Sequence, residues 1–314
     1  MRVFIAGATG VLGRALLPLL LAAGHEVTAT TRSPGKEDQV RAAGATPVVV
    51  DALDDARLLA AMVDARPDVV VHLLTAIPPA IDPRRWAEQF APNDELRVRA
   101  TQNLVAAARV AGVGRIVAES YAGLYARTGG AIKCEDDPLD IDAADARRQT
   151  ARALSALEQA VTRTDGINGI ALRLGTLYGP GTAYGPSGAM ADLARHGRLP
   201  IVGSGAGVSS FVHVDDAAAA IILALQHGAP GIYNVVDDDP AASHTWIPVF
   251  AAAVGAAPPR RIPAIAARLL AGKIAVSLMT EARGASNARV RRDLSWAPVH
   301  SSWREGFRSE ATPE

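Results

Sequence analysis

Residues 3–20 read VFIAGATGVLGRALLPLL, and this stretch decides the fold. An apolar run of strand length ends at Gly7 and a helical pattern begins at Val11. Gly7 permits a tight turn, Gly10 lets the backbone approach a pyrophosphate, and Gly13 lets the helix pack closely on the strand. The helix N-terminus offers unpaired N–H groups and the positive end of its dipole to phosphates. A glycine-rich turn without a ligand is the alternative, and the strand-to-helix context disfavours it.

Apolar segments of strand length alternate with helical segments along the first half of the chain. Valine and isoleucine runs that are separated by helices are typical of a parallel sheet covered on both faces. We therefore predict an α/β fold, a Rossmann-type doubly wound parallel sheet. The expected strands are 2–7, 26–32, 45–51, 67–75, 115–120 and 169–175; a first helix is expected from Val11, and further helices at 36–43, 55–65, 95–112 and 145–161.

The composition changes after this alternating part. From Gly179 onward proline and glycine are frequent and the helical segments are shorter. This C-terminal region is expected to pack against the carboxyl ends of the strands, where open α/β sheets bind ligands. We predict a Rossmann dinucleotide-binding domain of residues 1–178, to which 211–239 return, and a smaller mixed substrate-binding domain of 179–210 and 240–314.

Composition and charge exclude several classes of protein. Acidic and basic residues balance at 32 each and aromatic residues make up 4%, which suits neither a nucleic-acid groove nor an anionic membrane surface. Cys134 is the one cysteine, which excludes an internal disulfide. His72 is expected in the core, and Asp215 or Asp216 as a helix N-cap rather than a metal ligand. We expect a cytoplasmic protein that binds a small-molecule substrate and no nucleic acid, membrane or metal.

The end of the second strand distinguishes the two nicotinamide dinucleotides. NAD sites usually present a carboxylate there, whereas NADP sites present an arginine to the 2′-phosphate. This strand ends in TATTRSPGK, with Arg32 and Lys36 and no acid, so NADP (NADPH) is preferred over NAD. Solvated loop charges are the alternative for both side chains. Asp51, after the third strand, either accepts a hydrogen bond from the adenine amino group or caps the next helix.

Several segments occur together in one order: GATGVLG, VVVHLLT, RIVAESYAGLY, LRLGTLYGPG, SFVHVDDAAAAIILAL, GIYNVVDDDP and SNARVRRDLSWAP. In them the chain resembles the short-chain dehydrogenase/reductase superfamily, in its extended branch of epimerase/dehydratase-like proteins. The resemblance implies a nicotinamide cofactor and chemistry at a serine, a tyrosine and a lysine. The cofactor-binding residues expected from the glycine turn, the second strand and this resemblance are Gly7, Thr9, Gly10, Val11, Leu12, Gly13, Arg32, Lys36, Asp51, Ala52, Leu74, Thr75, Gly175, Thr176 and Leu177.

The family's catalytic pair has no counterpart in this chain. The family places the tyrosine and the lysine four residues apart on the helix after the fifth strand, often with a glutamate four residues later. Setting Glu158 on that glutamate puts Leu154 at the lysine and Thr150 at the tyrosine. No tyrosine or lysine occurs between Lys133 and Tyr178, so no shift of register restores the pair. Without a neighbouring cation, a phenol with an ordinary pKa of about 10 is a poor acid–base group near neutrality.

Three hydroxyl groups that precede this helix are the candidates for handling a proton. Ser120 stands where the family's catalytic serine orients a substrate oxygen. Tyr121 is nearest to Ser120 and is our first choice as a substitute acid. Tyr125 matches the loop tyrosine of the family's SSxxVYG pattern with one residue inserted, and it is either a further candidate or a wall of the substrate pocket.

Three functions follow in order of preference. The first is an atypical NADP-dependent oxidoreductase acting on a small carbonyl or alcohol, with Ser120 and a loop tyrosine in place of the usual relay. The second is a non-redox isomerase, dehydratase or cyclase on the same fold, and the third is an NADP-binding sensor. The family often dimerises through the helices after the fourth and fifth strands, so we expect a homodimer that uses the helix at 145–161.

Overall fold

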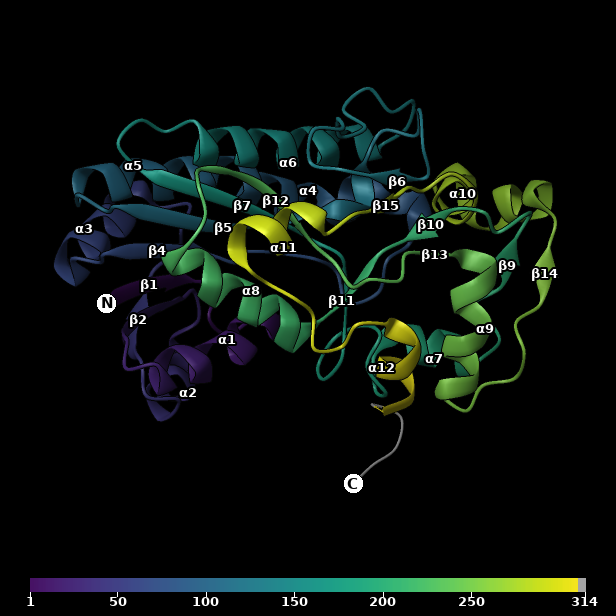
Figure 1. Ribbon diagram of the computed structural model, residues 1–314, viewed down its shortest axis with the longest axis horizontal. Coiled ribbons are helices and arrows are strands. Elements are labelled where there is room, and N and C mark those ends of the chain that lie inside the picture. The colour runs from purple at the N-terminus through teal and green to yellow at the C-terminus, as the bar shows by residue number, and fades with distance from the viewer. Residues whose placement is uncertain (310–314) are drawn as a thin grey trace.

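The computed structural model describes residues 1–309, and its centre is one seven-stranded sheet (Figure 1). The strands lie in the order β12-β7-β5-β4-β1-β2-β3, and every neighbouring pair is parallel. The winding direction reverses between β1 and β4, which is where such sheets bind ligands. The predicted doubly wound fold is confirmed. The strands are β1 (Arg2–Ala6), β2 (Glu26–Thr31), β3 (Thr46–Val49), β4 (Val69–His72), β5 (Arg115–Tyr121), β7 (Asn168–Leu174) and β12 (Gly231–Val235).

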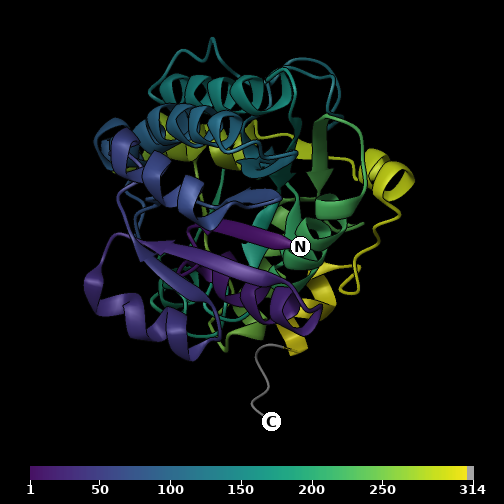
Figure 2. The same ribbon diagram turned by 90° about the vertical axis from the view of Figure 1, so that its left-hand side faces the viewer.

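Helices cover both faces of the sheet, as Figure 2 shows in a view of the molecule from the left-hand side of Figure 1. Successive side chains of a strand point to opposite faces, so β4 supplies Val71 to one core and Val70 to the other. Both side chains are fully buried. The first core is closed by α1 (Val11–Ala22), α2 (Glu37–Ala42) and α8 (Val214–Gln226), and the second by α3 (Asp55–Ala65), α5 (Thr101–Val110) and α6 (Arg147–Thr162).

The helix expected at 95–112 is one part of a longer composite. The helix α4 (Trp86–Glu95) runs into a π-helical turn, η3 (Leu96–Ala100), and α5 follows directly. The Thr101 hydroxyl donates to the carbonyl oxygen of Arg97 at 2.6 Å, within this π turn. Such turns inside α-helices frequently mark functional sites, and this one carries the buried side chain of Arg97.

Short elements form a region beyond the carboxyl ends of the sheet strands (Figure 1). Its core is an aromatic cluster that includes Tyr178, Phe211, Trp246, Phe250 and Phe307. The expected domain boundaries at 178, 211 and 239 stay a prediction. The paired short strands are β8 (Thr176–Tyr178) with β11 (Phe211–His213), β9 (Ile201–Val202) with β14 (Arg261–Ile262), β10 (Val208–Ser209) with β13 (Ala241–Ala242), and β6 (Ile132–Lys133) with β15 (Gly284–Ala285). The remaining helices of the described residues are η1 (Pro34–Lys36), η2 (Pro83–Arg85), η4 (Ala122–Leu124), α7 (Ala189–Arg195), α9 (Ser243–Ala253), α10 (Ala264–Thr280), which is kinked at Gly272, α11 (Ala288–Leu294) and α12 (Trp303–Ser309).

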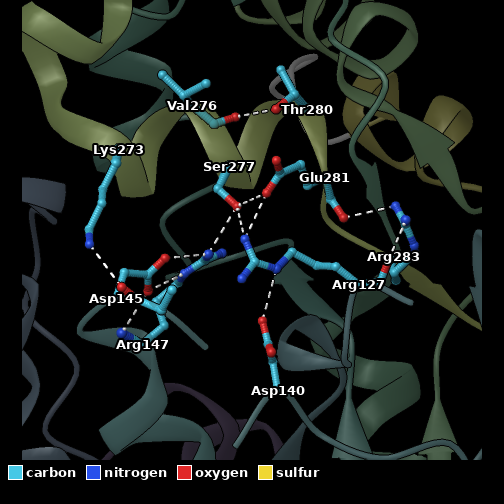
Figure 3. Close-up of polar contacts among 11 residues, drawn as sticks. Arg127, Asp140, Asp145, Arg147, Lys273, Val276, Ser277, Thr280, Glu281 and Arg283 are labelled. Carbon is cyan, nitrogen blue, oxygen red and sulfur yellow. Dashed lines mark hydrogen bonds and ion pairs between the residues drawn. The ribbon is translucent and has the colours of Figure 1, made fainter. Parts of the chain in front are cut away.

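A polar cluster fastens the second half of α10 to the segment between β5 and α6 (Figure 3). The Ser277 hydroxyl oxygen accepts from Arg127 at 2.8 Å and from Arg147 at 2.9 Å, and the hydroxyl donates to Glu281 at 2.6 Å. Arg147 also forms a two-pronged pair with Asp145, and both side chains are buried. This cluster therefore holds the C-terminal region in place beside the end of β5.

The N-terminus of α8 differs from the sequence prediction. Neither Asp215 nor Asp216 is the N-cap; His213 is, because its Nδ1 accepts from the N–H of Asp215 at 3.3 Å. Asp216 is buried and accepts instead from the N–H groups of Val299 and His300. Asp216 thus ties the C-terminal segment to α8. No helix within residues 1–309 is long and apolar enough to cross a membrane.

Candidate active site

The β1–α1 turn has the close contacts that only glycine allows. Gly7 has a φ of +101°, and a Cβ there would lie 2.5 Å from the carbonyl oxygen of Leu73, at the end of β4. A Cβ on Gly13 would lie 2.5 Å from the carbonyl oxygens of Gly7 and Ala8. Gly10 is the N-cap of α1 and offers no side-chain hydrogen bond. The residues therefore fit a dinucleotide, because the exposed helix N-terminus can accept its pyrophosphate.

The residues around this turn lie at the carboxyl ends of the sheet strands. Thr9 and Val11 are partly exposed beside the exposed Gly10, while Leu12 is buried in the core. The Thr9 carbonyl oxygen accepts from the Arg14 guanidinium at 3.2 Å. The side chains of Thr9 and Val11, together with Gly10, are therefore accessible at the N-terminus of α1, and their contact with a pyrophosphate stays a prediction.

The end of β2 presents positive charge without a carboxylate. Arg32 and Lys36 are exposed, and neither side chain has a hydrogen bond or ion pair within the described part of the chain, although the backbone N–H of Lys36 donates to the Ser33 carbonyl oxygen at 3.0 Å. Asp51 does not cap α3: its side chain accepts from the N–H of Leu53, and Asp54 is the N-cap. The helix-capping role of Asp51 is therefore wrong. Its contact with the adenine stays a prediction, and so does the cofactor contact of the neighbouring Ala52, which is buried.

A buried neutral histidine shapes the loop after β4. The Thr101 hydroxyl already donates to Arg97, so it accepts from His72 Nε2 at 2.9 Å, and His72 Nδ1 accepts from the N–H of Leu74 at 3.2 Å. Burial, and secondarily the charge of Arg97, lower the pKa of His72 to about 3. The predicted core position of His72 is found, and it orients the loop that carries Leu74 and the exposed Thr75.

On the other side of the switch point, the end of β7 turns sharply into β8. Gly175 is buried, and a Cβ there would lie 2.8 Å from the carbonyl oxygen of Ser210. Thr176 and Leu177 follow with partly exposed side chains. These residues lie at the same edge of the sheet as the β1–α1 turn, as the expected approach to the nicotinamide requires.

Ser120 lies where no substrate can reach it in this structure. Its side chain is fully buried, and its hydroxyl donates to Glu158 Oε1 at 2.7 Å. Glu158 in turn forms a two-pronged pair with Arg173, with N–O distances of 2.7 and 2.8 Å. The one hydroxyl hydrogen of Ser120 is therefore used in linking β5, α6 and β7.

Tyr125 is also committed to the framework. It is 3% exposed, its hydroxyl donates to Asn234 Oδ1 at 2.6 Å, and the Arg173 guanidinium lies 4.9 Å from the centre of its ring. Burial raises the pKa of Tyr125 to about 12. A phenol in this state is a weak proton donor, so the geometry favours the interpretation of Tyr125 as a packing residue over the catalytic one.

Tyr121 is the candidate that remains partly exposed. Its hydroxyl lies 3.4 Å from Thr176 Oγ1, and its ring covers Gly123, where a Cβ would lie 2.3 Å from the ring. Burial raises the pKa of Tyr121. Tyr184, which the sequence did not single out, lies close enough for Tyr121 to add to the rise in its own pKa that burial causes. The hydroxyl groups of Tyr121, Thr176 and Tyr184 are therefore grouped near the carboxyl ends of β5 and β7.

The helix α6 carries no proton-transfer group at the positions expected from the family. Thr150 Oγ1 accepts from Trp86 Nε1 and donates to Asp94 Oδ2, both at 3.1 Å. Leu154 is 1% exposed and packs in a cluster with Leu124 and Tyr125. Both residues thus fasten α6 to its neighbours.

Two charged residues at this edge were missed by the sequence interpretation. Glu119 lies on β5 beside Ser120, and Arg97 reaches it from the π turn, with 3.7 Å between Arg97 Nη2 and Glu119 Oε1. A signal for Glu119 existed, because it is the one acid inside the apolar strand RIVAES. No sequence signal places Arg97 beside it. Within residues 1–309, no group of three or more His, Cys, Asp or Glu side chains could hold a metal ion.

Comparison with known proteins supplies the relatives of this chain. The profile of the NAD dependent epimerase/dehydratase family matches residues 3–235. A 3-diazoavenalumate denitrifying reductase from Streptomyces sp. is 46% identical over 312 residues, which cover 99% of this chain and 100% of that protein. A 2-alkyl-3-oxoalkanoate reductase from Stenotrophomonas maltophilia is 27% identical over 268 residues, covering 82% and 76%. The UDP-glucose 4-epimerase of Thermotoga maritima, crystallised with UDP-glucose, shares the fold with a TM-score of 0.77 at 18% identity, covering 99% and 97%.

Proposed function

Because the chain belongs to the NAD dependent epimerase/dehydratase family, we propose that it is an NADP-dependent reductase that acts on a small electrophilic substrate. The observation that carries this proposal is the 46% identity, over the full length of both chains, to a reductase. The glycine contacts of the β1–α1 turn and the uncapped N-terminus of α1 support it. When bound there, the dinucleotide supplies the hydride.

The residues take distinct roles in this proposal. The pyrophosphate lies against Gly7, Thr9, Gly10, Val11, Leu12 and Gly13; the 2′-phosphate against Arg32 and Lys36; the adenine against Asp51 and Ala52; and the nicotinamide half against Leu74, Thr75, Gly175, Thr176 and Leu177. Tyr121 borders the substrate pocket and orients the substrate through its hydroxyl. Ser120 and Tyr125 support this wall through their own buried hydrogen bonds.

The substrate that we propose first is a diazo-substituted carboxylate. The support is the name of the 46% identical relative, a denitrifying reductase of 3-diazoavenalumate. In such a reduction the carbon that carries the diazo group gains one hydride and one proton, its bond to nitrogen breaks, and N₂ leaves. One hydride and one proton are consumed for each N₂ released, so electrons and charge balance.

A 3-oxo carboxylate is the second candidate substrate. It is favoured by the name of the other relative, a 2-alkyl-3-oxoalkanoate reductase, at 27% identity. Here the carbonyl carbon gains the hydride and the carbonyl oxygen gains the proton. This candidate retains the small carbonyl that the sequence predicts, and both substrates need one hydride and one proton.

A panel of acceptors tests the proposed function directly. The purified protein is mixed with NADPH and, in separate reactions, with a diazo carboxylate, a 3-oxo carboxylate and a saturated carboxylate that cannot be reduced. We expect loss of nicotinamide absorbance together with N₂ release in the first reaction and none in the last. Oxidation with the 3-oxo acid alone selects the second substrate. Tight NADPH binding without oxidation of any acceptor would contradict the proposal and favour an NADP-binding sensor, and a converted substrate with unchanged absorbance would favour an isomerase, dehydratase or cyclase.

We also propose a homodimer that uses α4 and α6. A groove of about 420 Å³ runs between these helices on the molecular surface and is lined in part by Ala91, Ala153 and Ala156. Small side chains allow the helices of a second copy to approach closely. Sedimentation equilibrium tests this: we expect a dimer that the substitution Ala91→Glu, at an exposed position of the groove, converts to a monomer, and a wild-type monomer at micromolar concentration would contradict it.

A further inference from the structure

The carboxylate of Glu119 stands at the edge of the sheet where the substrate would react. Glu119 pairs in register with Leu172 of β7, whose side chain packs in the core beneath α1 and α8. Partners in register on a parallel sheet share a face, so Glu119 and Tyr121 point to this side and Ser120 to the other. Glu119 therefore shares the face of Tyr121, two residues nearer the start of β5.

Glu119 lacks the hydrogen bonds that a structural carboxylate normally has. The part of the chain that the structure describes holds no hydrogen bond to its side-chain oxygens, and the nearest charge is Arg97 at 3.7 Å. The Glu119 side chain is 13% exposed. Buried carboxylates that serve only the framework are paired and hydrogen-bonded, as Glu158 is with Arg173 and Ser120. Glu119 keeps its acceptor sites available to a ligand.

Arg97 shows the same incomplete pairing from the opposite side. Its Nη1 donates to the backbone carbonyl of Glu119 at 3.2 Å, while its Nε is buried without a hydrogen-bond partner. The side chain of Arg97 is 4% exposed. The π turn thus delivers a guanidinium to the end of β5, where it touches Glu119 without saturating it.

The charges that surround Glu119 permit a protonated carboxyl. Burial raises its pKa and the charge of Arg97 opposes that rise. Burial also lowers the pKa of Arg97, against the charges of Glu119, Asp94 and Glu158. His72, which faces Arg97 from β4, is kept neutral by its lowered pKa. Tyr121, the neighbour on the same strand, is a phenol whose own pKa burial raises, so it too is uncharged near neutrality.

We propose that Glu119 is the proton donor of the reduction and that Arg97 is its positioning residue. This inference rests on the proposed function. The Glu119 carboxyl gives its proton to the diazo carbon, or to the carbonyl oxygen of an oxo acid, while the same substrate accepts one hydride from the nicotinamide. The Glu119 carboxylate then regains a proton from water. The proton role that the family assigns to α6 thereby lies on β5 in this chain.

The first test needs no substrate. Infrared difference spectra of the wild-type protein minus Glu119→Gln are recorded without cofactor across the neutral pH range. We expect a protonated carboxyl band in the wild type at neutral pH that disappears at alkaline pH and that Glu119→Gln lacks. Absence of this band at neutral and at mildly acidic pH would overturn the proposal, because the acid would then have no proton to give.

The second test uses turnover with the acceptor found in the panel. Glu119→Gln is expected to lower kcat by about 100-fold or more and to leave KM and the affinity for NADPH within about twofold, because a general acid acts in the transition state. The wild-type rate is expected to fall as pH rises through the pKa of Glu119, and the residual rate of Glu119→Gln to stay level. Glu95→Gln is the matched control, because Glu95 is exposed and pairs with Arg99 on the far side of η3.

The outcomes separate the two proposals. Wild-type kcat and an unchanged pH profile in Glu119→Gln would overturn the role of Glu119 while the reductase function stands. If the protonated Glu119 band is present but none of the acceptors causes oxidation of NADPH, the reductase function is refuted, while the finding that Glu119 is a protonated acid stands. If Glu119→Gln does not fold, Glu119→Asp serves instead: it should keep the falling pH profile at reduced kcat, and a level profile in this variant would overturn the proposal.

Discussion

The turn between β1 and α1 and the helix α6 lie on opposite sides of the same sheet edge, and they have diverged differently from the family pattern. The turn keeps each glycine that a dinucleotide needs, with carbonyl oxygens 2.5 Å from where a Cβ would lie on Gly7 or Gly13. In α6, Thr150 and Leu154 are both engaged in packing with neighbouring helices and loops. The contrast predicts that cofactor binding and proton transfer are separable on this fold. The structure shows that the glycine contacts of the turn are present beside an α6 whose Thr150 and Leu154 pack against its neighbours.

The largest expected effect comes from restoring the family's lysine to α6. Leu154→Lys would bury an unpaired ammonium among apolar side chains, because Glu158, one helical turn later, is already paired with Arg173. We expect the free energy of unfolding to fall by about 4 kcal/mol in urea titrations, with Leu154→Met losing less than about 1.5 kcal/mol. A Thr150→Tyr, Leu154→Lys variant of wild-type stability and increased kcat would return the catalytic role to α6 and break the comparison.

The next effect concerns the cofactor side. Gly13→Val would force the first turn of α1 away from the Gly7 and Ala8 carbonyl oxygens, so the N–H groups would no longer converge on the pyrophosphate. We expect the Kd for NADPH to rise by about 100-fold or more in calorimetric titrations, with circular dichroism showing a folded protein. Gly35→Ala, in an open part of the loop after β2, is the control and should bind normally. Tight binding by Gly13→Val would refute the assignment of the turn.

The third effect is the pH dependence of stability that arises from His72, at the end of β4. His72 has a pKa of about 3 when folded against an ordinary 6.5, so the unfolded chain takes up a proton that the folded chain refuses. Stability from this group is complete above pH 6.5 and is lost as pH falls toward 3, by about 2 kcal/mol between pH 7 and pH 5. Urea titrations of the wild type should show this loss, and those of His72→Gln a shallower slope. Equal slopes would mean that His72 takes up protons in the folded protein.

The smallest expected effect separates the two dinucleotides. Arg32→Ala should raise the Kd for NADPH by about tenfold and leave that for NADH within about twofold, because the guanidinium serves the 2′-phosphate alone. Fluorescence titrations with both cofactors measure this. Equal losses for the two, or a wild-type preference for NADH, would contradict the NADP assignment and bring the chain closer to the NAD dependence in the family's name.

The fold could be predicted because its signals are local, and the signal for the dinucleotide turn, which stays a prediction, is local too. A valine run such as VVVH specifies a buried parallel strand, and the spacing of Gly7, Gly10 and Gly13 follows from one turn and one helix. The fate of Ser120 could not be predicted from spacing, since it depends on Glu158 and Arg173 arriving from two other elements. The position of the Arg97 side chain depends on a π turn that shifts the register of the helix by one residue. No pattern in the sequence marks this turn.

The most direct measurement is a single turnover with NADPH that carries deuterium at its transferable hydride position, in ordinary water. With the acceptor identified by the panel, the account predicts one deuterium on the carbon that is reduced. The accompanying hydrogen should come from solvent through Glu119, and repeating the turnover in deuterated water with ordinary NADPH should place deuterium at that second position instead. A product that forms without deuterium from the cofactor would contradict the central claim that this chain is a hydride-transferring reductase.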